Sequence, residues 1–308
     1  MFPADEGPHQ SLTEWWYYTG HLTSAAGHTY GFEFVIFQVE RQNQPTGYLS
    51  HFAISDVDAE RFSHQVHFAQ TPAPAAGFPL NVDGWTLDHQ ASGDTLVAAM
   101  QPGPGAESAY AIRLQVDDTG KPPALHHGGY LSLASAGGSY YYSRTRLEVH
   151  GSVSGPDGAA EDVQGIAWMD HQWGNFVVSA RGGWDWYCLQ LDDNTELMLY
   201  VIRSPDGSQT ALFGSHVQAD GSVDDLGAGA VSSEALGTWT SPHTAAVYPS
   251  GWQLTLEDGR HLTLTPQLLD QELYFPAAPG LLAYWEGAVT ISGDASGQGY
   301  VELTGYAP

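Results

Sequence analysis

Positive charge and sulfur are both scarce in this sequence. Lysine and arginine together number 9 against 35 aspartates and glutamates, so the formal net charge is −26, and Lys121 is the single lysine. Such an acidic chain repels phosphate backbones and anionic lipid head groups, which argues against nucleic-acid and membrane-surface binding. Cys188 is the single cysteine, so an internal disulfide and a thiolate metal knuckle are excluded. We therefore expect a neutral or apolar small molecule as the partner.

Long apolar runs are absent as well. No segment approaches the roughly 18 consecutive apolar residues of a membrane-spanning helix, and no charged-then-apolar leader opens the chain. We expect no transmembrane segment. The opening Met1-Phe2-Pro3 fits a natural start and equally a chain from which a leader was removed. A periplasmic or secreted location and a cytoplasmic one therefore both stay open, as does the oligomeric state.

The common catalytic signatures are missing. The chain has no G-x-S-x-G elbow, no G-x-G-x-x-G loop, no P-loop and no H-E-x-x-H. The pairs His64/His67 and His126/His127 have the character of metal ligands, but without a recognisable third ligand they are more typical of packed or surface histidines. We therefore expect no metal and no cofactor.

Glycine and proline are abundant instead, at 36 and 18 residues, and interrupt the chain too often for long helices. Between them, short runs alternate apolar and polar residues, as in Trp252–Glu257 and again after Asp258-Gly259, which is typical of a β-hairpin. From Arg144 to His150 we expect the odd-numbered residues to face inward and the even-numbered ones outward. Thr29–Val39 is apolar on both faces. The predicted fold class is all-β, with antiparallel hairpins closing into barrels or sandwiches.

A length of 308 residues favours two domains. Gly165–Gly174 is too specific in sequence to be a linker, so we place the division after it, near residue 178. The predicted domains are residues 1–178 and 179–308.

One cluster, Trp168–Gly174, carries an aspartate and a histidine between two indoles. Burial against indoles would raise the pKa of Asp170 and let it deliver a proton near neutral pH, and the indole faces would stabilise a cation. The alternative is that Asp170 and His171 are structural residues at a corner of the fold. Asp185, between Trp184 and Trp186, is a second candidate acid.

Several segments occur in one order along the chain: Glu14–Gly20, His51–Asp56, Tyr141–Arg144, Trp168–Gly174, Gly183–Trp186, Tyr284–Gly287 and Gly299–Tyr306. Together they resemble the lipocalin-like family of carotenoid 1,2-hydratases and attachment-operon (AttH-type) proteins, and the opening segment resembles the AttH-type branch more. The resemblance implies two lipocalin-like β-barrels packed together, with an apolar ligand pocket within or between them.

The family's activities include hydration of an isoprenoid double bond, hydration of a prenylated phenol and pericyclic ring closure. We therefore expect a cofactor-free hydratase of an isoprenoid-like substrate, with Asp170 as proton donor and His171 tuning it or positioning water. A lipid or isoprenoid carrier without catalysis, and a pericyclase-like enzyme, are the alternatives. The expected substrate-binding residues are Trp16, His51, Tyr142, Trp168, Trp173, Trp184 and Trp186.

Overall fold

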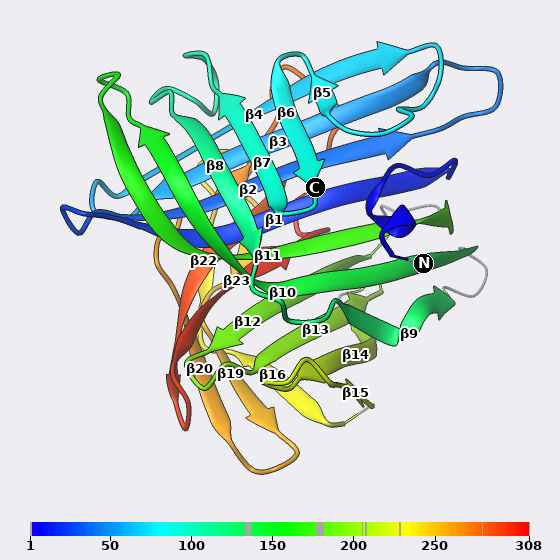
Figure 1. The fold of residues 1–308 in the computed structure, drawn as a ribbon. Helices are drawn as coiled ribbons and strands as arrows, with labels where there is room; N and C mark the ends of the chain where they lie inside the picture. The colour runs from blue at the N-terminus through cyan, green and yellow to red at the C-terminus, as the bar shows by residue number, and fades with distance from the viewer. Residues whose placement is uncertain are drawn as a thin grey trace. The chain divides into compact units, whose positions relative to one another are not determined.

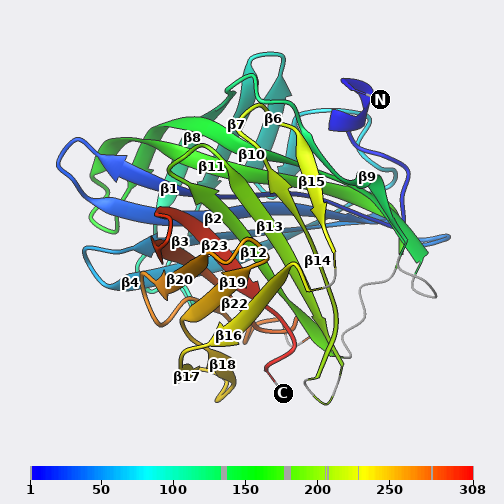
Figure 2. The same ribbon diagram turned by 90° about the horizontal axis from the view of Figure 1, so that it is seen from below.

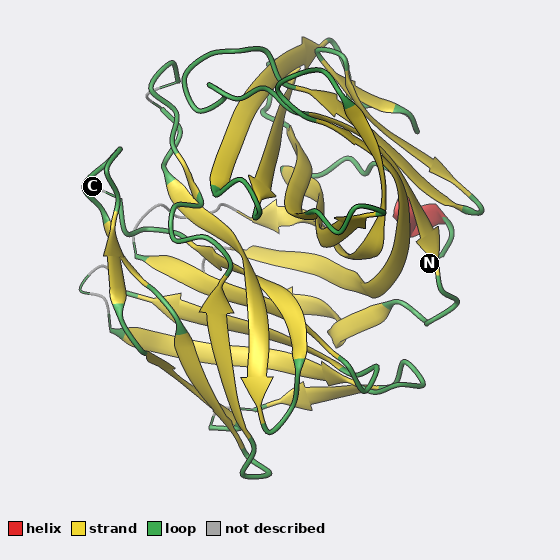
Figure 3. Ribbon diagram, turned by 90° about the vertical axis from the view of Figure 1, so that its left-hand side faces the viewer, coloured by secondary structure: helices red, strands yellow, loops and turns green. Residues whose placement is uncertain are grey.

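The computed structural model describes residues 2–132, 137–176, 182–204, 206, 208–227, 229–278 and 280–307. Nearly all regular structure is β, which confirms the predicted class (Figure 3). The helical exception among these residues is one 3-10 turn, η1 (Ala4–Glu6). No helix in the described part of the chain has the length and apolarity needed to cross a membrane.

The first sheet has 11 strands in the order β4-β3-β2-β1-β11-β10-β8-β7-β6-β5, with β9 paired to β10 (Figure 1). The first strand thus pairs with the last, as an antiparallel sheet does when it curls toward a barrel. Its strands are β1 (Thr13–Ser24), β2 (Thr29–Val39), β3 (Thr46–Asp56), β4 (Arg61–Thr71), β5 (Leu80–Val82), β6 (Trp85–Gln90), β7 (Gly93–Ala99), β8 (Ala111–Asp118), β9 (Ala124–Ser132), β10 (Gly137–Ser154) and β11 (Ala160–Phe176).

The second sheet repeats this plan with 10 strands in the order β15-β14-β13-β12-β23-β22-β20-β19-β16, while β21 pairs with β22 (Figure 2). Strands β17 and β18 form a separate two-stranded sheet. The strands are β12 (Gly183–Leu191), β13 (Glu196–Arg203), β14 (Gln209–Val217), β15 (Val223–Leu226), β16 (Val231–Ala235), β17 (Thr238–Thr240), β18 (Val247–Pro249), β19 (Trp252–Leu256), β20 (His261–Pro266), β21 (Glu272–Leu273), β22 (Tyr284–Gly293) and β23 (Gly297–Leu303).

Two compact units follow from the contacts within the chain. One comprises Met1–Ile54 and Ser63–Val178, and the other Ser55–Phe62 and Ser179–Pro308. Each unit holds one large sheet, so the architecture is that of a two-domain lipocalin-like protein. The predicted division at residue 178 lies outside the described residues and stays a prediction.

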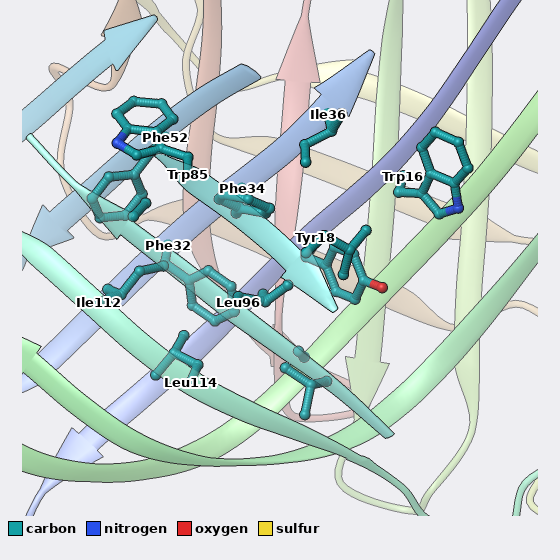
Figure 4. Packing of buried hydrophobic residues seen from close by; sticks show 14 of the residues in the cluster. Trp16, Tyr18, Phe32, Phe34, Ile36, Phe52, Trp85, Leu96, Ile112 and Leu114 are labelled. Atoms are coloured by element: carbon teal, nitrogen blue, oxygen red, sulfur yellow. The ribbon is translucent and has the colours of Figure 1, made fainter. Parts of the chain in front are cut away.

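Each sheet has its own apolar core. In the first unit, aromatic side chains of β1 and β2 point toward Leu96 on β7 and Leu114 on β8 (Figure 4). Burying one such ring stabilises the fold by roughly 2–3 kcal/mol. In the second unit, the predicted hairpin is confirmed, since β19 and β20 pair antiparallel with Trp252 opposite Leu264. The two largest aromatics of that core are Trp252 and Trp285.

A β-bulge lies in β10 between Arg144 and Leu147, where its register with β11 shifts. From Leu147 onward the predicted alternation holds, with Leu147 and Val149 in the core. Before the bulge the faces are exchanged, because one extra residue reverses which side chains point inward. Arg144, expected to face outward, instead pairs with the buried Glu6.

Candidate functional site

The two faces of β11 separate Asp170 from His171. Successive side chains of a strand point to opposite faces of the sheet, so sequence neighbours cannot share one site on it. Ser143 lies opposite Asp170 on β10, whereas Tyr142 lies opposite His171. The contacts of Asp170 and His171 accordingly involve different residues, and the expected role of His171, to tune Asp170 or to position water, stays a prediction.

Asp170 is held by three uncharged donors. Tyr141 Oη donates to its Oδ2 at 2.6 Å, and Trp168 Nε1 donates to its Oδ1 at 2.6 Å. Ser143 Oγ also donates to Oδ1. The carboxyl group is buried, with 5% of the residue exposed. It is therefore a fixed, desolvated carboxyl group surrounded by hydroxyl and indole donors.

Burial raises the pKa of Asp170 to about 6, while the hydrogen bonds from Ser143, Tyr141 and Trp168 act in the opposite direction. Desolvation destabilises the carboxylate, and donors aimed at the carboxylate stabilise it. The indole of Trp168 thus lowers this pKa through its N–H, and the rise comes from exclusion of water. With this pKa, about half of Asp170 holds its proton at pH 6 and about a tenth at pH 7.

His126 on β9 extends this cluster through Ser143. His126 Nε2 lies 2.7 Å from Ser143 Oγ, and its ring packs against Tyr141 with centroids 4.5 Å apart. Burial lowers the pKa of His126 to about 3, so its imidazole is neutral at physiological pH. A neutral imidazole exists in two tautomers, and its Nε2 either donates to Ser143 or accepts from it. The hydrogen bond between His126 and Ser143 can therefore run in either direction, as the protonated and the ionised state of Asp170 each require.

His171 lies on the other face, within the first barrel's core. His171 Nε2 is 2.9 Å from Glu14 Oε1, and His171 Nδ1 is 3.2 Å from Tyr142 Oη. Its ring stacks on Trp16, with centroids 4.8 Å apart, and contacts Trp173 at 4.7 Å. Burial lowers the pKa of His171, although Glu14 opposes this. This face of β11 brings together four of the residues predicted from the sequence, namely Trp16, Tyr142, His171 and Trp173.

The remaining predicted residues lie elsewhere. His51, on β3, packs against Phe37 at 5.7 Å, and burial lowers the pKa of His51 to about 3. Trp184 and Trp186 belong to β12 in the second unit, where Trp184 stacks on Tyr200 at 6.1 Å. The structure therefore brings Trp168 to Asp170, and it brings Trp16, Tyr142 and Trp173 to His171. The remaining predicted side chains, His51, Trp184 and Trp186, lie in other surroundings.

The sequence interpretation missed two sets of partners. Tyr141 and Ser143 contact Asp170, and His126 contacts Ser143. On the other face, Glu14 contacts His171, and His9 contacts Glu14. The signal available in the sequence was the hairpin that pairs β10 with β11. Near the turn of this hairpin, Ser154 pairs with Ala160. If the register continued unchanged from that pair, Arg144 would lie opposite Asp170, whereas the bulge brings Ser143 there.

The whole chain matches one family model. Residues 1–306 match the AttH-like model. The chain belongs to the AttH-like family. A solved structure of an AttH candidate from Nitrosomonas europaea is 29% identical to this AttH-like chain, with a TM-score of 0.89, covering 100% of this chain and 97% of that one.

Two further solved structures share the fold of this AttH-like protein. Kievitone hydratase from Nectria haematococca is 17% identical with a TM-score of 0.77, covering 99% of this chain and 92% of its own. CghA is 12% identical with a TM-score of 0.54, covering 96% and 89%. No curated protein matches the chain. The AttH-like chain thus shares its fold with kievitone hydratase and with CghA.

Proposed function

We propose that this protein is a hydratase that adds water across a carbon–carbon double bond of an isoprenoid-like, apolar substrate, with Asp170 as the proton donor. The observation that carries the proposal is the buried carboxyl group of Asp170, which is surrounded by neutral donors and has a pKa raised to about 6. A general acid works best when its pKa lies near the operating pH.

In the proposed reaction, Asp170 donates one proton to the substrate and later takes one proton back. Asp170 protonates the less substituted alkene carbon, which leaves a tertiary carbocation and the Asp170 carboxylate. Water adds to the cation, and the resulting oxonium returns a proton to Asp170, so substrate and water together give a tertiary alcohol. We assign stabilisation of the cation to the indole of Trp168, because its N–H donates to the same carboxylate at 2.6 Å.

Ser143 and His126 would accommodate both states of the acid. When Asp170 is ionised, Ser143 donates to it and accepts from His126 Nε2. When Asp170 is protonated, it donates to Ser143, which donates to His126 Nε2 in the other tautomer. The short contacts of the series, including 2.7 Å from His126 to Ser143, allow this reversal without moving a heavy atom.

Three observations support a hydratase over the alternatives. Kievitone hydratase, a hydratase by name, has this fold at a TM-score of 0.77. Furthermore, large aromatic side chains fill the interior of the first barrel, where a carrier of the lipocalin type would hold its lipid (Figure 4). A buried carboxylic acid with a raised pKa also suits proton transfer, whereas a protein that only carries a lipid does not need one.

The test is turnover in H₂¹⁸O with a panel of detergent-solubilised acyclic carotenoids and shorter isoprenoids, followed by mass spectrometry. We expect a product heavier by one labelled water, absent with Asp170→Asn and retained with the matched variant Asp185→Asn. Ligand that co-purifies unchanged would establish a carrier instead. An isomerised, ring-closed product without the label would establish a pericyclase.

A further inference from the structure

Three potential metal ligands converge on the face of β11 opposite Asp170. One ligand atom from each of His9, Glu14 and His171 lies within 4.8 Å of the other two, and Glu14 Oε1 is 2.7 Å from His9 Nδ1 and 2.9 Å from His171 Nε2. They come from the segment after η1, from β1 and from β11, at the end of the first sheet where β1 begins and β11 ends (Figure 1). We propose that His9, Glu14 and His171 bind a divalent transition-metal ion of the zinc class.

The hydrogen count along this cluster favours a cation. Four short contacts run in series from Glu6 through Tyr142, His171 and Glu14 to His9, with heavy-atom distances of 2.6, 3.2, 2.9 and 2.7 Å. Each contact requires one hydrogen between its two atoms. With neutral imidazoles and ionised carboxylates, Tyr142, His171 and His9 supply three hydrogens for four contacts. The series is therefore one hydrogen short, even with Arg144 paired to Glu6 at its far end, and one more positive charge at Glu14 would fill that place.

A metal ion supplies this charge and replaces both contacts to Glu14 at once. His171 Nε2 then binds the ion, and its Nδ1–H donates to Tyr142 Oη, which donates to Glu6 Oε2 at 2.6 Å. His9 Nδ1 binds the ion, and its Nε2 is left facing Asp5 Oδ1 at 3.9 Å. Each pair of atoms in the series is then joined either by one hydrogen or by the metal ion.

The atoms of these residues that do not face the ion are already held. Glu14 Oε2 accepts from His9 N–H at 2.8 Å and from Gln38 Nε2 at 3.2 Å, which leaves Oε1 directed at the two imidazoles. The His9 ring stacks flat on Trp173, with centroids 4.2 Å apart and an interplanar angle of 1°. Metal sites in proteins are built this way, because outer partners fix the orientation of each ligand.

The ligand set points to the class of ion. Two imidazoles and one carboxylate suit zinc and its first-row neighbours, whereas calcium and magnesium prefer oxygen ligands. Three protein ligands leave a fourth position for water or another small ligand. His9 and Trp173 also line a surface groove with Tyr130 and Tyr140, so the site adjoins solvent on the side of His9.

The test is a titration of the full chain, stripped with a chelator and dialysed, with Co²⁺ followed by its visible absorption and with Zn²⁺ in competition. We expect one Co²⁺ per chain. His9→Asn should weaken binding by roughly 100-fold or more, beyond the 10–100-fold typical of losing an outer partner. The matched control is His28→Asn, which removes another histidine paired with a carboxylate, at 2.9 Å from Glu161, and should leave binding unchanged.

Two results would overturn the proposal. Absence of any stoichiometric Co²⁺ or Zn²⁺ binding would mean that a proton supplies the missing charge. Equal weakening, or none, in the His9 and His28 variants would place the ion elsewhere. If His9→Asn does not fold, as judged by circular dichroism, stoichiometry and absorption of the unaltered chain still decide between one ordered site and none. The hydratase assay is read separately, because Asp170 lies on the opposite face of β11.

Discussion

Two buried aspartates, Asp170 in the first unit and Asp185 in the second, have similar sequence neighbours but differ in the charge of their hydrogen-bond donors. Both lie on strands rich in tryptophan. Asp170 accepts hydrogen bonds from a tyrosine, a serine and an indole. Asp185 accepts from Arg203 Nε at 3.1 Å and from Tyr306 Oη at 3.0 Å, and the guanidinium of Arg203 lies 3.8 Å above the Tyr306 ring.

The difference lies in the charge of the donors. Burial raises the pKa of both carboxyl groups, and for Asp185 the full positive charge of Arg203 offsets part of that rise. A cation favours the carboxylate more strongly than neutral donors of similar geometry do. Asp185 is thus one half of an ion pair, whereas Asp170 can keep and release a proton. Flanking indoles alone do not distinguish an acid from a structural carboxylate.

The largest expected effect separates the two aspartates by turnover. Asp170→Asn should lower the rate of hydration by roughly 10²–10⁴-fold, the usual contribution of a positioned general acid. Asp185→Asn should stay within a few-fold of the unaltered protein. The measurement is the ¹⁸O product assay with both variants at equal folded concentration. Comparable losses in both variants would remove the distinction.

Removing the positive charge of Arg203 should lower the stability of the second unit. Arg203→Gln leaves Asp185 buried without its charge partner, and the side chains of Asp185 and Arg203 are only 12% and 11% exposed. We expect a loss of roughly 3 kcal/mol, near the lower end for breaking a buried ion pair. Urea unfolding at pH 7 measures it. Restored stability in the double variant with Asp185→Asn would confirm that the unpaired charge is the cause.

The raised pKa of Asp170 also predicts a pH dependence of stability. The folded chain holds this proton up to pH about 6, whereas an ordinary aspartate loses it near 3.8. Because the folded state binds more protons in this window, its stability should fall by about 3 kcal/mol as pH rises from about 4 to about 6, and stay level above.

The measurement is the free energy of unfolding of the unaltered chain minus that of Asp170→Asn at several pH values. Subtraction removes the contributions of the other titrating groups. A difference that stays constant across this window would show that Asp170 has an ordinary pKa in the folded state.

The smallest expected effect concerns one neutral donor. Tyr141→Phe removes a hydroxyl that stabilises the Asp170 carboxylate, so the pKa of Asp170 should rise by about one unit. Turnover, which requires the protonated acid, should then persist to a pH about one unit higher. The pH–rate profile measures this, with Tyr140→Phe as control, since Tyr140 is exposed and stacks on Trp173. A profile that does not move would exclude this hydroxyl as a determinant of the pKa.

Much of the fold could be predicted from local patterns. Alternation around Asp258-Gly259 predicted the β19–β20 hairpin, and the two-sided apolar run Thr29–Val39 predicted a strand buried on both faces. Both features depend on residues close in sequence. The alternation of apolar and polar residues and the residue types of the turn are therefore enough to predict them.

The arrangement of the site could not be predicted in the same way. Asp170 and His171 appeared as one cluster because they are adjacent in sequence, yet strand geometry directs them to opposite faces. The partners of Asp170 depend on the bulge between Arg144 and Leu147, which brings Ser143 opposite it. Long-range register of this kind depends on packing in three dimensions, and a single extra residue changes every pair beyond it.

The most direct test of the central claim is a pH titration of the Asp170 carboxyl group by ¹³C NMR of protein labelled at aspartate Cγ. The Asp170→Asn and Asp185→Asn variants assign the two resonances. The account predicts that the resonance lost in Asp170→Asn titrates with a pKa of about 6 in the folded chain. An Asp170 resonance that titrates near 4, as in an exposed aspartate, would contradict it.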